Sequence, residues 1–320
     1  MSSAGRIGAF TVGLAAVFGV ALVGGHAVGP LDTSPPPAMH GHGTMPSGGA
    51  STDAHAGHGS GTAESAAASL PGGLQVAQDG YRLVLDQQSN ATGRRPVSFT
   101  VLGRDGRPVT AYDMQHEKQL HLIAARRDLT GFQHVHPVLG SDGRWRTQLD
   151  LTPGQWRIFA DFKATGGPAL TLGDDLAVPG DYRPAPPARP TTTTTVDGYA
   201  VTLTGRLTPG RTAPMTLSIT KGGKPVRDLQ PYLGAYGHLV TLREGDLAYL
   251  HVHPEGEPGD GKTPAGPGVT FEATAPSVGS YRMFLDFKHD GVVRTAELAV
   301  RTDAAGTAPA TDHGATPHAH

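Results

Sequence analysis

The chain has 320 residues, 45 of them glycine and 27 proline, which is typical of about two domains joined by flexible connections. Its 26 basic and 28 acidic residues nearly balance, so the charge indicates neither nucleic acid nor an anionic membrane surface as a partner. Cysteine is absent, which excludes disulfides, thiolate metal ligands and cysteine nucleophiles, whereas histidine is abundant, with 16 residues.

The N-terminus is typical of an exported protein. An apolar run without a polar face, residues 7–23, follows Arg6 and ends in a stretch of small residues. We therefore expect residues 1–28 to be a signal peptide or, because the run is long enough to remain, an anchor in the cytoplasmic membrane. Either outcome places the rest of the chain outside the cytoplasm, secreted or anchored.

The next segment, residues 29–74, consists mostly of Pro, Gly, Ser, Ala and His, and we expect a disordered tether. Its histidines and methionines are closely spaced, which favours metal capture over a plain soluble spacer. Imidazole binds Cu(II) or Zn(II) and thioether binds Cu(I), so copper suits this set: Met39, His40, His42, Met45, His55 and His58. A Pro/Thr-rich linker is expected at residues 182–196, and a disordered histidine-containing tail at 303–320.

Two folded blocks remain, residues 75–181 and 197–302, and they are copies of one unit. Related phrases occur in the same order in both: GRPV at 106–109 and GKPV at 223–226, then WRIFADFK at 156–163 and YRMFLDFK at 281–288. The second copy carries a Gly/Pro-rich insertion after its HVHP phrase, as expected for a surface loop.

Apolar residues within each copy alternate with polar ones, as in half-buried strands. In WRIFADFK, residues 156, 158, 160 and 162 share one face, and Phe159 is an apolar exception on the other. About seven short strands in roughly 100 residues are typical of an antiparallel sandwich. The predicted fold is all-β, with two tandem immunoglobulin-like or cupredoxin-like β-sandwiches preceded by an N-terminal hydrophobic helix.

The pattern H-x12-H-x-H-P occurs once in each copy, as His121, His134 and His136 and again as His238, His251 and His253. Residues i and i+2 of a strand lie on one face, so each HVH presents two imidazoles together. If Glu244 and Gly245 form a two-residue hairpin tip, His238 lies opposite His251, whereas a longer turn would shift this register. Three imidazoles would then gather as in the all-histidine site of zinc enzymes such as carbonic anhydrase.

The alternative is that these histidines point into a core and are hydrogen bonded there, because the same strand faces also carry Ile123 and Phe132. The first copy has an additional pair, His116 and Glu117, close to Met114, and is therefore the better candidate for a complete site. Two aspartates at equivalent places, Asp161 and Asp286, fall on the face opposite the core residues, so we expect them to be solvated or to be charges at a strand edge.

The phrases RRDLTGFQHVHP, WRIFADFK, YLHVHPEG and YRMFLDFKHDG resemble those of a family of exported actinobacterial proteins of unknown function. In domain type the blocks are similar to YtkA-like and CopC-like β-sandwiches. That resemblance implies copper handling in the periplasm or at the cell surface. CopC-type ligands use an N-terminal histidine arrangement that has no match here, so no ligand residue is carried over.

The sequence therefore predicts an extracytoplasmic transition-metal-binding protein, with copper as the expected ion and zinc as the alternative. It would act in metal buffering, resistance or delivery to an envelope metal-transport partner. The competing interpretation is a structural or adhesive cell-envelope protein without a metal requirement. Motifs of hydrolases, P-loop proteins and dinucleotide enzymes are absent, so we expect no enzyme; the alternative is a metal-dependent hydrolase that uses Glu117.

Overall fold

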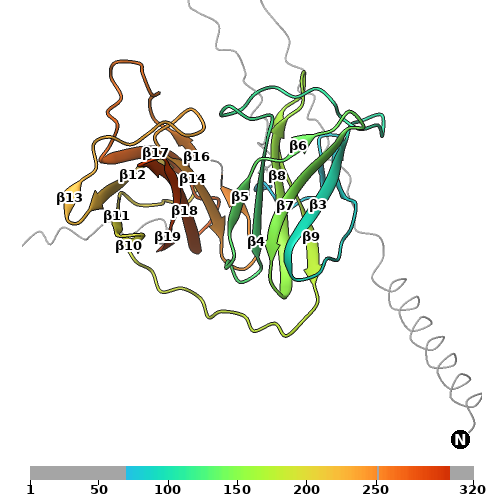
Figure 1. The fold of residues 1–320 in the computed structure, drawn as a ribbon, viewed down its shortest axis with the longest axis horizontal. Helices are drawn as coiled ribbons and strands as arrows, with labels where there is room; N and C mark the ends of the chain where they lie inside the picture. The colour runs from blue at the N-terminus through green and yellow to red at the C-terminus, as the bar shows by residue number, and fades with distance from the viewer. Residues whose placement is uncertain (1–69, 251, 303–320) are drawn as a thin grey trace, which may run out of the picture. The chain divides into compact units, whose positions relative to one another are not determined.

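The computed structural model describes residues 70–250 and 252–302, with the backbone alone of His253. All regular elements in these residues are β-strands, so the predicted all-β fold is confirmed (Figure 1). The expected N-terminal helix, most of the expected tether, the tail and His251 lie outside the described residues. The chain divides into two units, 1–64 and 65–320, and the described residues belong to the second. No helix in the described part is long and apolar enough to cross a membrane.

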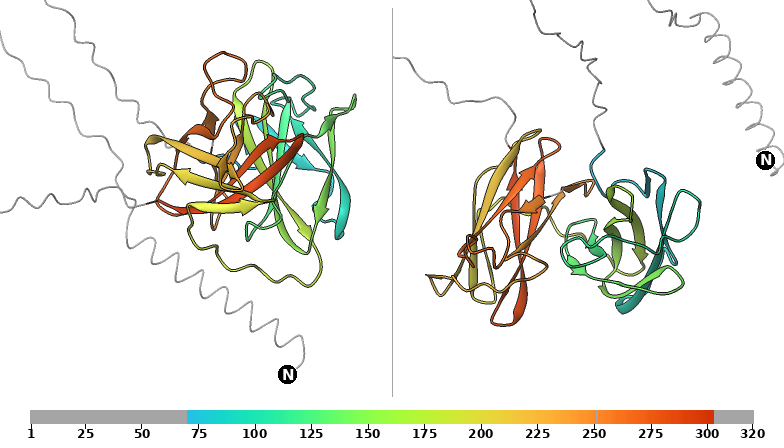
Figure 2. Two further views of the ribbon diagram at one scale, coloured as in Figure 1. Left: turned by 60° about the vertical axis from the view of Figure 1, so that its left-hand side comes forward. Right: turned by 90° about the horizontal axis from the view of Figure 1, so that it is seen from above.

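The first repeat is a sandwich of two antiparallel sheets, seen from further directions in Figure 2. One sheet has the order β1-β2-β3-β7-β6, with β1 at Ala77–Gln78, β2 at Tyr81–Leu85, β3 at Gly93–Leu102, β7 at Arg144–Leu151 and β6 at Val138–Leu139. The other has the order β5-β4-β8-β9, with β5 at Gln133–Val135, β4 at Leu120–Arg126, β8 at Gly154–Lys163 and β9 at Ala169–Val178.

The second repeat has the same two-sheet plan. One sheet has the order β10-β11-β12-β17-β16, with β10 at Thr193–Val196, β11 at Tyr199–Thr204, β12 at Thr212–Lys221, β17 at Gly268–Thr274 and β16 at Val252–Pro254; β13, Lys224–Pro225, pairs with β12. The other has the order β15-β14-β18-β19, with β15 at Tyr249–Leu250, β14 at His238–Arg243, β18 at Ser280–His289 and β19 at Val292–Arg301. Strand β10 occupies the end of the segment expected to be a linker.

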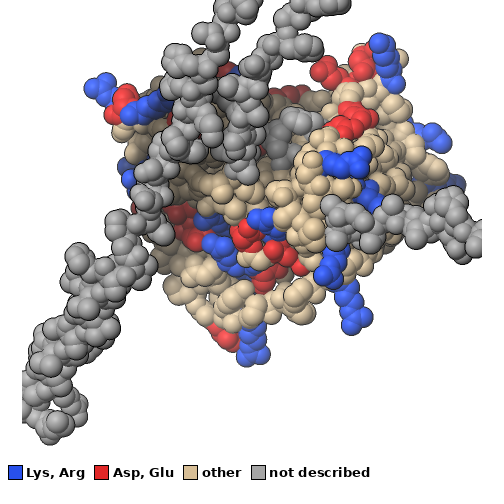
Figure 3. Space-filling model, turned by 180° about the vertical axis from the view of Figure 1, so that it is seen from behind, with Lys and Arg blue, Asp and Glu red and all other residues tan. Residues whose placement is uncertain are grey.

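Each sandwich has its own apolar core, and strand alternation selects the residues that enter it. In β8 the core residues include Trp156, Ile158 and Phe162, and in β18 they include Tyr281 and Met283. Burial of these side chains supplies most of the favourable free energy of folding. Acidic and basic side chains lie side by side on the surface shown in Figure 3, as the near-neutral charge of the chain leads one to expect.

A third apolar cluster joins the two repeats. It is built from the outward faces of the β4 and β14 sheets and contains Ile123, Ala125, Leu129, Phe159, Val240, Leu242, Leu247, Tyr249 and Phe284, with Phe132 packed against it. Phe132 stacks on Phe284 with ring centroids 3.9 Å apart, and Phe159 lies 5.8 Å from Tyr249. The apolar exception noted in β8 is therefore explained, since this strand is buried on both faces.

The end of the segment expected to be a tether is part of the fold. The amide of Gly73 donates to the Thr171 carbonyl at 2.7 Å, and its own carbonyl accepts hydrogen bonds from the Arg157 guanidinium. Gly73 has φ of 74°, and a Cβ there would lie 2.4 Å from the Phe159 ring. Only glycine fits this approach without displacement of the aromatic side chain.

Candidate metal centre

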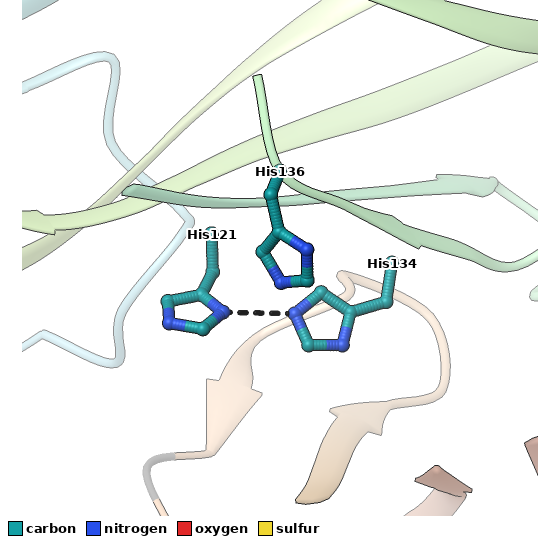
Figure 4. A group of neighbouring side chains, drawn as sticks. All are labelled: His121, His134 and His136. Atoms are coloured by element: carbon teal, nitrogen blue, oxygen red, sulfur yellow. Dashed lines mark hydrogen bonds between the residues drawn. The ribbon is translucent and has the colours of Figure 1, made fainter. Parts of the chain in front are cut away.

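Three histidines of the first repeat converge on one point. His121 lies on β4, His134 on β5, and His136 follows β5 directly. Their neighbours Leu120, Leu122 and Val135 face the sandwich core, so alternation turns all three imidazoles to the opposite face. Figure 4 shows His136 directed toward the His121 and His134 rings, and one nitrogen of each ring lies within 4.8 Å of the other two.

The hydrogen bonds of His121 and His134 fix which nitrogens face each other. Nε2 of His121 lies 2.9 Å from the backbone carbonyl oxygen of Gln115, which only accepts, so Nε2 carries the hydrogen of the neutral ring. Nδ1 of His134 lies 2.8 Å from the Asp286 carboxylate and must likewise donate. The remaining nitrogens, Nδ1 of His121 and Nε2 of His134, are 3.0 Å apart and both present lone pairs when the rings are neutral. Either a proton on one of these nitrogens or a metal ion between them makes that contact favourable.

Burial disfavours protons in this cluster. His121 is 2% exposed, and desolvation, with help from neighbouring histidines, lowers its pKa to about 4. Desolvation likewise lowers the pKa of His136 to about 3, and Nε2 of His136 is buried without a hydrogen-bond partner. Neutral imidazoles are the form that binds metal ions, so at neutral pH His121 and His136 are ready to act as ligands.

The second repeat contributes two further groups. The ring of His238 stacks on that of His121, with centroids 5.2 Å apart and planes inclined by 11°. Asp286, expected to be solvated, is instead 3% exposed. The alternation placed it correctly on the face opposite the sandwich core, but that face is covered by the other repeat. Asp286 is the member of this cluster that sequence reasoning missed, and its recurrence as Asp161 at the equivalent position was the available signal.

The predicted register of the second histidine hairpin is wrong. Leu242 pairs with Tyr249, and Arg243 and Ala248 close a loop at residues 244–247, so the pairing is shifted by two residues. Leu247 has φ of 61°, a left-handed conformation that the sequence did not indicate. The chain then crosses to the other sheet, where β16 pairs with β17. His251 and the side chain of His253 lie outside the described residues, so their predicted role as ligands stays a prediction.

The additional pair of the first repeat forms a tight turn beside the cluster. Gln115 and Lys118 exchange backbone hydrogen bonds around His116 and Glu117, whose φ values are 48° and 64°. The His116 ring lies 5.2 Å from that of His238 and 6.1 Å from that of His121. Glu117 is exposed, and so is Met114, at 59%. The structure thus places His116 with the cluster and turns Glu117 to the surface.

The remaining candidate ligands, Met39, His40, His42, Met45, His55 and His58, lie outside the described residues. Their interpretation as metal ligands stays a prediction.

A family model described as a domain of unknown function, DUF8832, matches the chain twice, at residues 75–178 and 194–304, which together make up more than half of its 320 residues. The chain belongs to the DUF8832 family. The two matches coincide with the two sandwiches, so one DUF8832 unit corresponds to one repeat. No curated protein matches the chain.

Solved structures similar to this DUF8832 chain include surface proteins of low sequence identity. The Escherichia coli adhesin FdeC is 17% identical over 73% of this chain and 67% of its own, with a TM-score of 0.21. The Yersinia pseudotuberculosis adhesin InvE is 10% identical over 71% of this chain and 60% of its own, less than two thirds of its length, with a TM-score of 0.21. Domains 4 and 5 of the S-layer protein SbsC are 9% identical over 72% and 100%, with a TM-score of 0.22. The DUF8832 histidines are therefore interpreted from their own geometry.

Proposed function

We propose that the protein binds a transition-metal ion, Cu(II) or Zn(II), through His121, His134 and His136. One observation carries this proposal: Nδ1 of His121 and Nε2 of His134 face each other at 3.0 Å while the opposite nitrogen of each ring is committed to an acceptor. Two ligands of a tetrahedral ion with metal–nitrogen distances of about 2.0–2.1 Å are about 3.3 Å apart, so a small outward movement of the rings accommodates the ion.

The donor set selects the class of metal. Imidazole suits zinc and copper, whereas calcium and magnesium prefer oxygen ligands. The chain has no cysteine, and Met114 is exposed, so nothing in this cluster favours a soft ion such as Cu(I). We propose copper as the ion and zinc as the alternative, and a binding rather than a catalytic role, since Glu117 is exposed on the turn.

The proposed role is extracytoplasmic metal buffering, resistance or delivery to an envelope metal-transport partner. It rests on the exported character of the N-terminal sequence and on the histidine and methionine groups of residues 39–58, which would collect metal. A structural or adhesive function without metal is the competing proposal, and one titration separates the two.

The experiment is a titration of the full chain with Cu(II) and Zn(II) in chelator-buffered solution, so that weak sites outside the cluster stay empty. We expect one ion to bind tightly to the wild-type chain, and the His134→Ala, His136→Ala double variant to lose that binding. His289→Ala is the matched control, because His289 is a buried histidine bonded to Tyr199 in the second repeat, outside the cluster. Equal affinity in the double variant and the wild type overturns the assignment, and no tight binding to either favours the structural function.

A further inference from the structure

We infer that the metal site is shared between the two repeats: His238 supplies a fourth imidazole, and Asp286 holds His134 in its ligating orientation. This inference rests on the proposed metal binding and adds to it the second half of the site. Metal occupancy would then stabilise the contact between the sandwiches.

Among the described residues, the ligand nitrogens of His121, His134 and His136 form the group that lies mutually within 4.8 Å, so His238 has to move inward to join it. Its position beside the group and an unmade hydrogen bond point to His238 as the fourth ligand. It lies on β14 with its ring centroid 5.2 Å from that of His121 and 5.1 Å from that of His134. Its Nδ1 atom is buried without a hydrogen-bond partner, as is Nε2 of His136. Buried ring nitrogens without partners are costly, and a bound ion removes that cost. The two atoms come from different repeats.

Asp286 fixes the orientation and tautomer of His134 from the other repeat. The two residues are 152 positions apart in sequence, and their side chains are 2% and 5% exposed. The other carboxylate oxygen of Asp286 accepts a hydrogen bond from Thr295, which holds the carboxylate in place. A carboxylate that accepts the second N–H of a ligating histidine both orients the ring and makes it a better donor. Asp286 is thus a positioning residue.

The charge of Asp286 also favours a bound cation. Among the ion pairs of the described residues, His134 is its partner, and no lysine or arginine lies within 4.0 Å of its carboxylate. A buried carboxylate is strongly disfavoured unless it is hydrogen bonded and paired with positive charge, which a proton or a metal ion on His134 can supply. A divalent ion on His134 would offset this charge. Because His238 pairs with Asp286 in the β14–β18 register, both groups come from one small area of the second repeat.

The test uses three variants of the full chain, His238→Ala, His238→Gln and Asp286→Asn, and two matched controls. Asp228→Asn changes a carboxylate that is bonded to a histidine away from the cluster, His289, and His289→Ala removes that buried histidine. Chelator-buffered titration with Cu(II) and Zn(II) gives the affinity. X-ray absorption of the bound ion counts the imidazoles, and melts without metal show whether each variant is folded.

We expect both His238 variants to bind with three imidazoles instead of four and with affinity reduced by at least about tenfold. Asp286→Asn should keep four imidazoles but lose about 10–100-fold in affinity, and the controls should stay within about threefold of wild type. The shared site would be overturned if the His238 and Asp286 variants kept the affinity and the imidazole count of the wild type. If the His134→Ala, His136→Ala variant still lost binding, the proposed function would stand. Absence of binding to the wild-type chain overturns both.

Discussion

The Asp286 carboxylate accepts a hydrogen bond from Nδ1 of His134 at 2.8 Å, although the two residues belong to different repeats. This bond connects the histidine pair of the first repeat to a strand in the middle of the second. The proposed metal binding would therefore be coupled to the packing of the two sandwiches.

Metal should stabilise the folded chain. An ion that binds only the folded state at one hundred times its dissociation constant adds about 2.7 kcal/mol to the free energy of unfolding. We expect a higher melting temperature with Zn(II) or Cu(II), and an unchanged one in His121→Ala, His134→Ala. Calorimetry with and without a chelator measures both. An equal rise in the variant would place the bound ion elsewhere in the chain.

Acid should destabilise the metal-free protein at unusually mild pH. The pKa of His121 is lowered to about 4 and that of His136 to about 3, from 6.5. As pH falls below about 6.5 the unfolded chain binds protons at these positions and the folded chain does not, so the free energy of unfolding decreases from there toward pH 4. Urea unfolding at pH 7, 6 and 5 with chelator measures this. His136→Leu should flatten the dependence, and a flat curve for the wild type would contradict buried neutral imidazoles.

The apolar cluster between the repeats should be a major source of stability. Phe284 is fully buried and stacks on Phe132, so Phe284→Ala should lower the free energy of unfolding by about 3–5 kcal/mol. Phe284→Leu, which retains most of the volume, should cost less than about 1.5 kcal/mol. Urea unfolding compares the two. The exposed Val138→Ala is the control, at 72% exposure, and a Phe284→Ala cost no larger than that of the control would mean that the cluster contributes little.

The turn at His116 and Glu117 should carry backbone strain. Glu117 is exposed with φ of 64°, a conformation that glycine adopts without penalty, so Glu117→Gly should raise the free energy of unfolding by about 1 kcal/mol. The equivalent turn of the second repeat already has Gly234 there, with φ of 76°. If Glu117→Gly leaves the metal affinity unchanged, the result agrees with a binding role of the protein in which Glu117 takes no part. A large loss of metal affinity would mean that Glu117 is a functional residue.

The strands and the repeat could be predicted because period-two alternation and recurrent phrases are local properties of sequence. The face that carries His121 was also predictable, since residues on either side of it enter the sandwich core. The environment of that face was not, because it depends on how one repeat packs on the other. Phe159 and Asp286 were misjudged for this reason. In the sequence Phe159 seemed an apolar exception and Asp286 a surface charge, but each is buried by the other repeat.

The hairpin register shows a different limit. Hairpin loops of two and of four residues are both common, and Leu247 gives no local signal for its left-handed conformation. The β14–β15 pairing ends at Leu250, and residues 252–254 pair with β17 in the other sheet. Strand faces are therefore more predictable than strand partners in this chain.

The contacts across the third apolar cluster are reciprocal. Phe132 of the first repeat contacts Phe284 of the second, while their counterparts Tyr249 and Phe159 contact each other, and His121 stacks on its own counterpart, His238. In an isologous homodimer, residue i of one subunit contacts residue j of the other and the reverse contact also occurs, because the subunits are related by a two-fold axis. The two repeats show this pattern within one chain. The fusion frees the halves to diverge, as at His116 and Leu233, so a near-symmetric interface can hold an asymmetric site.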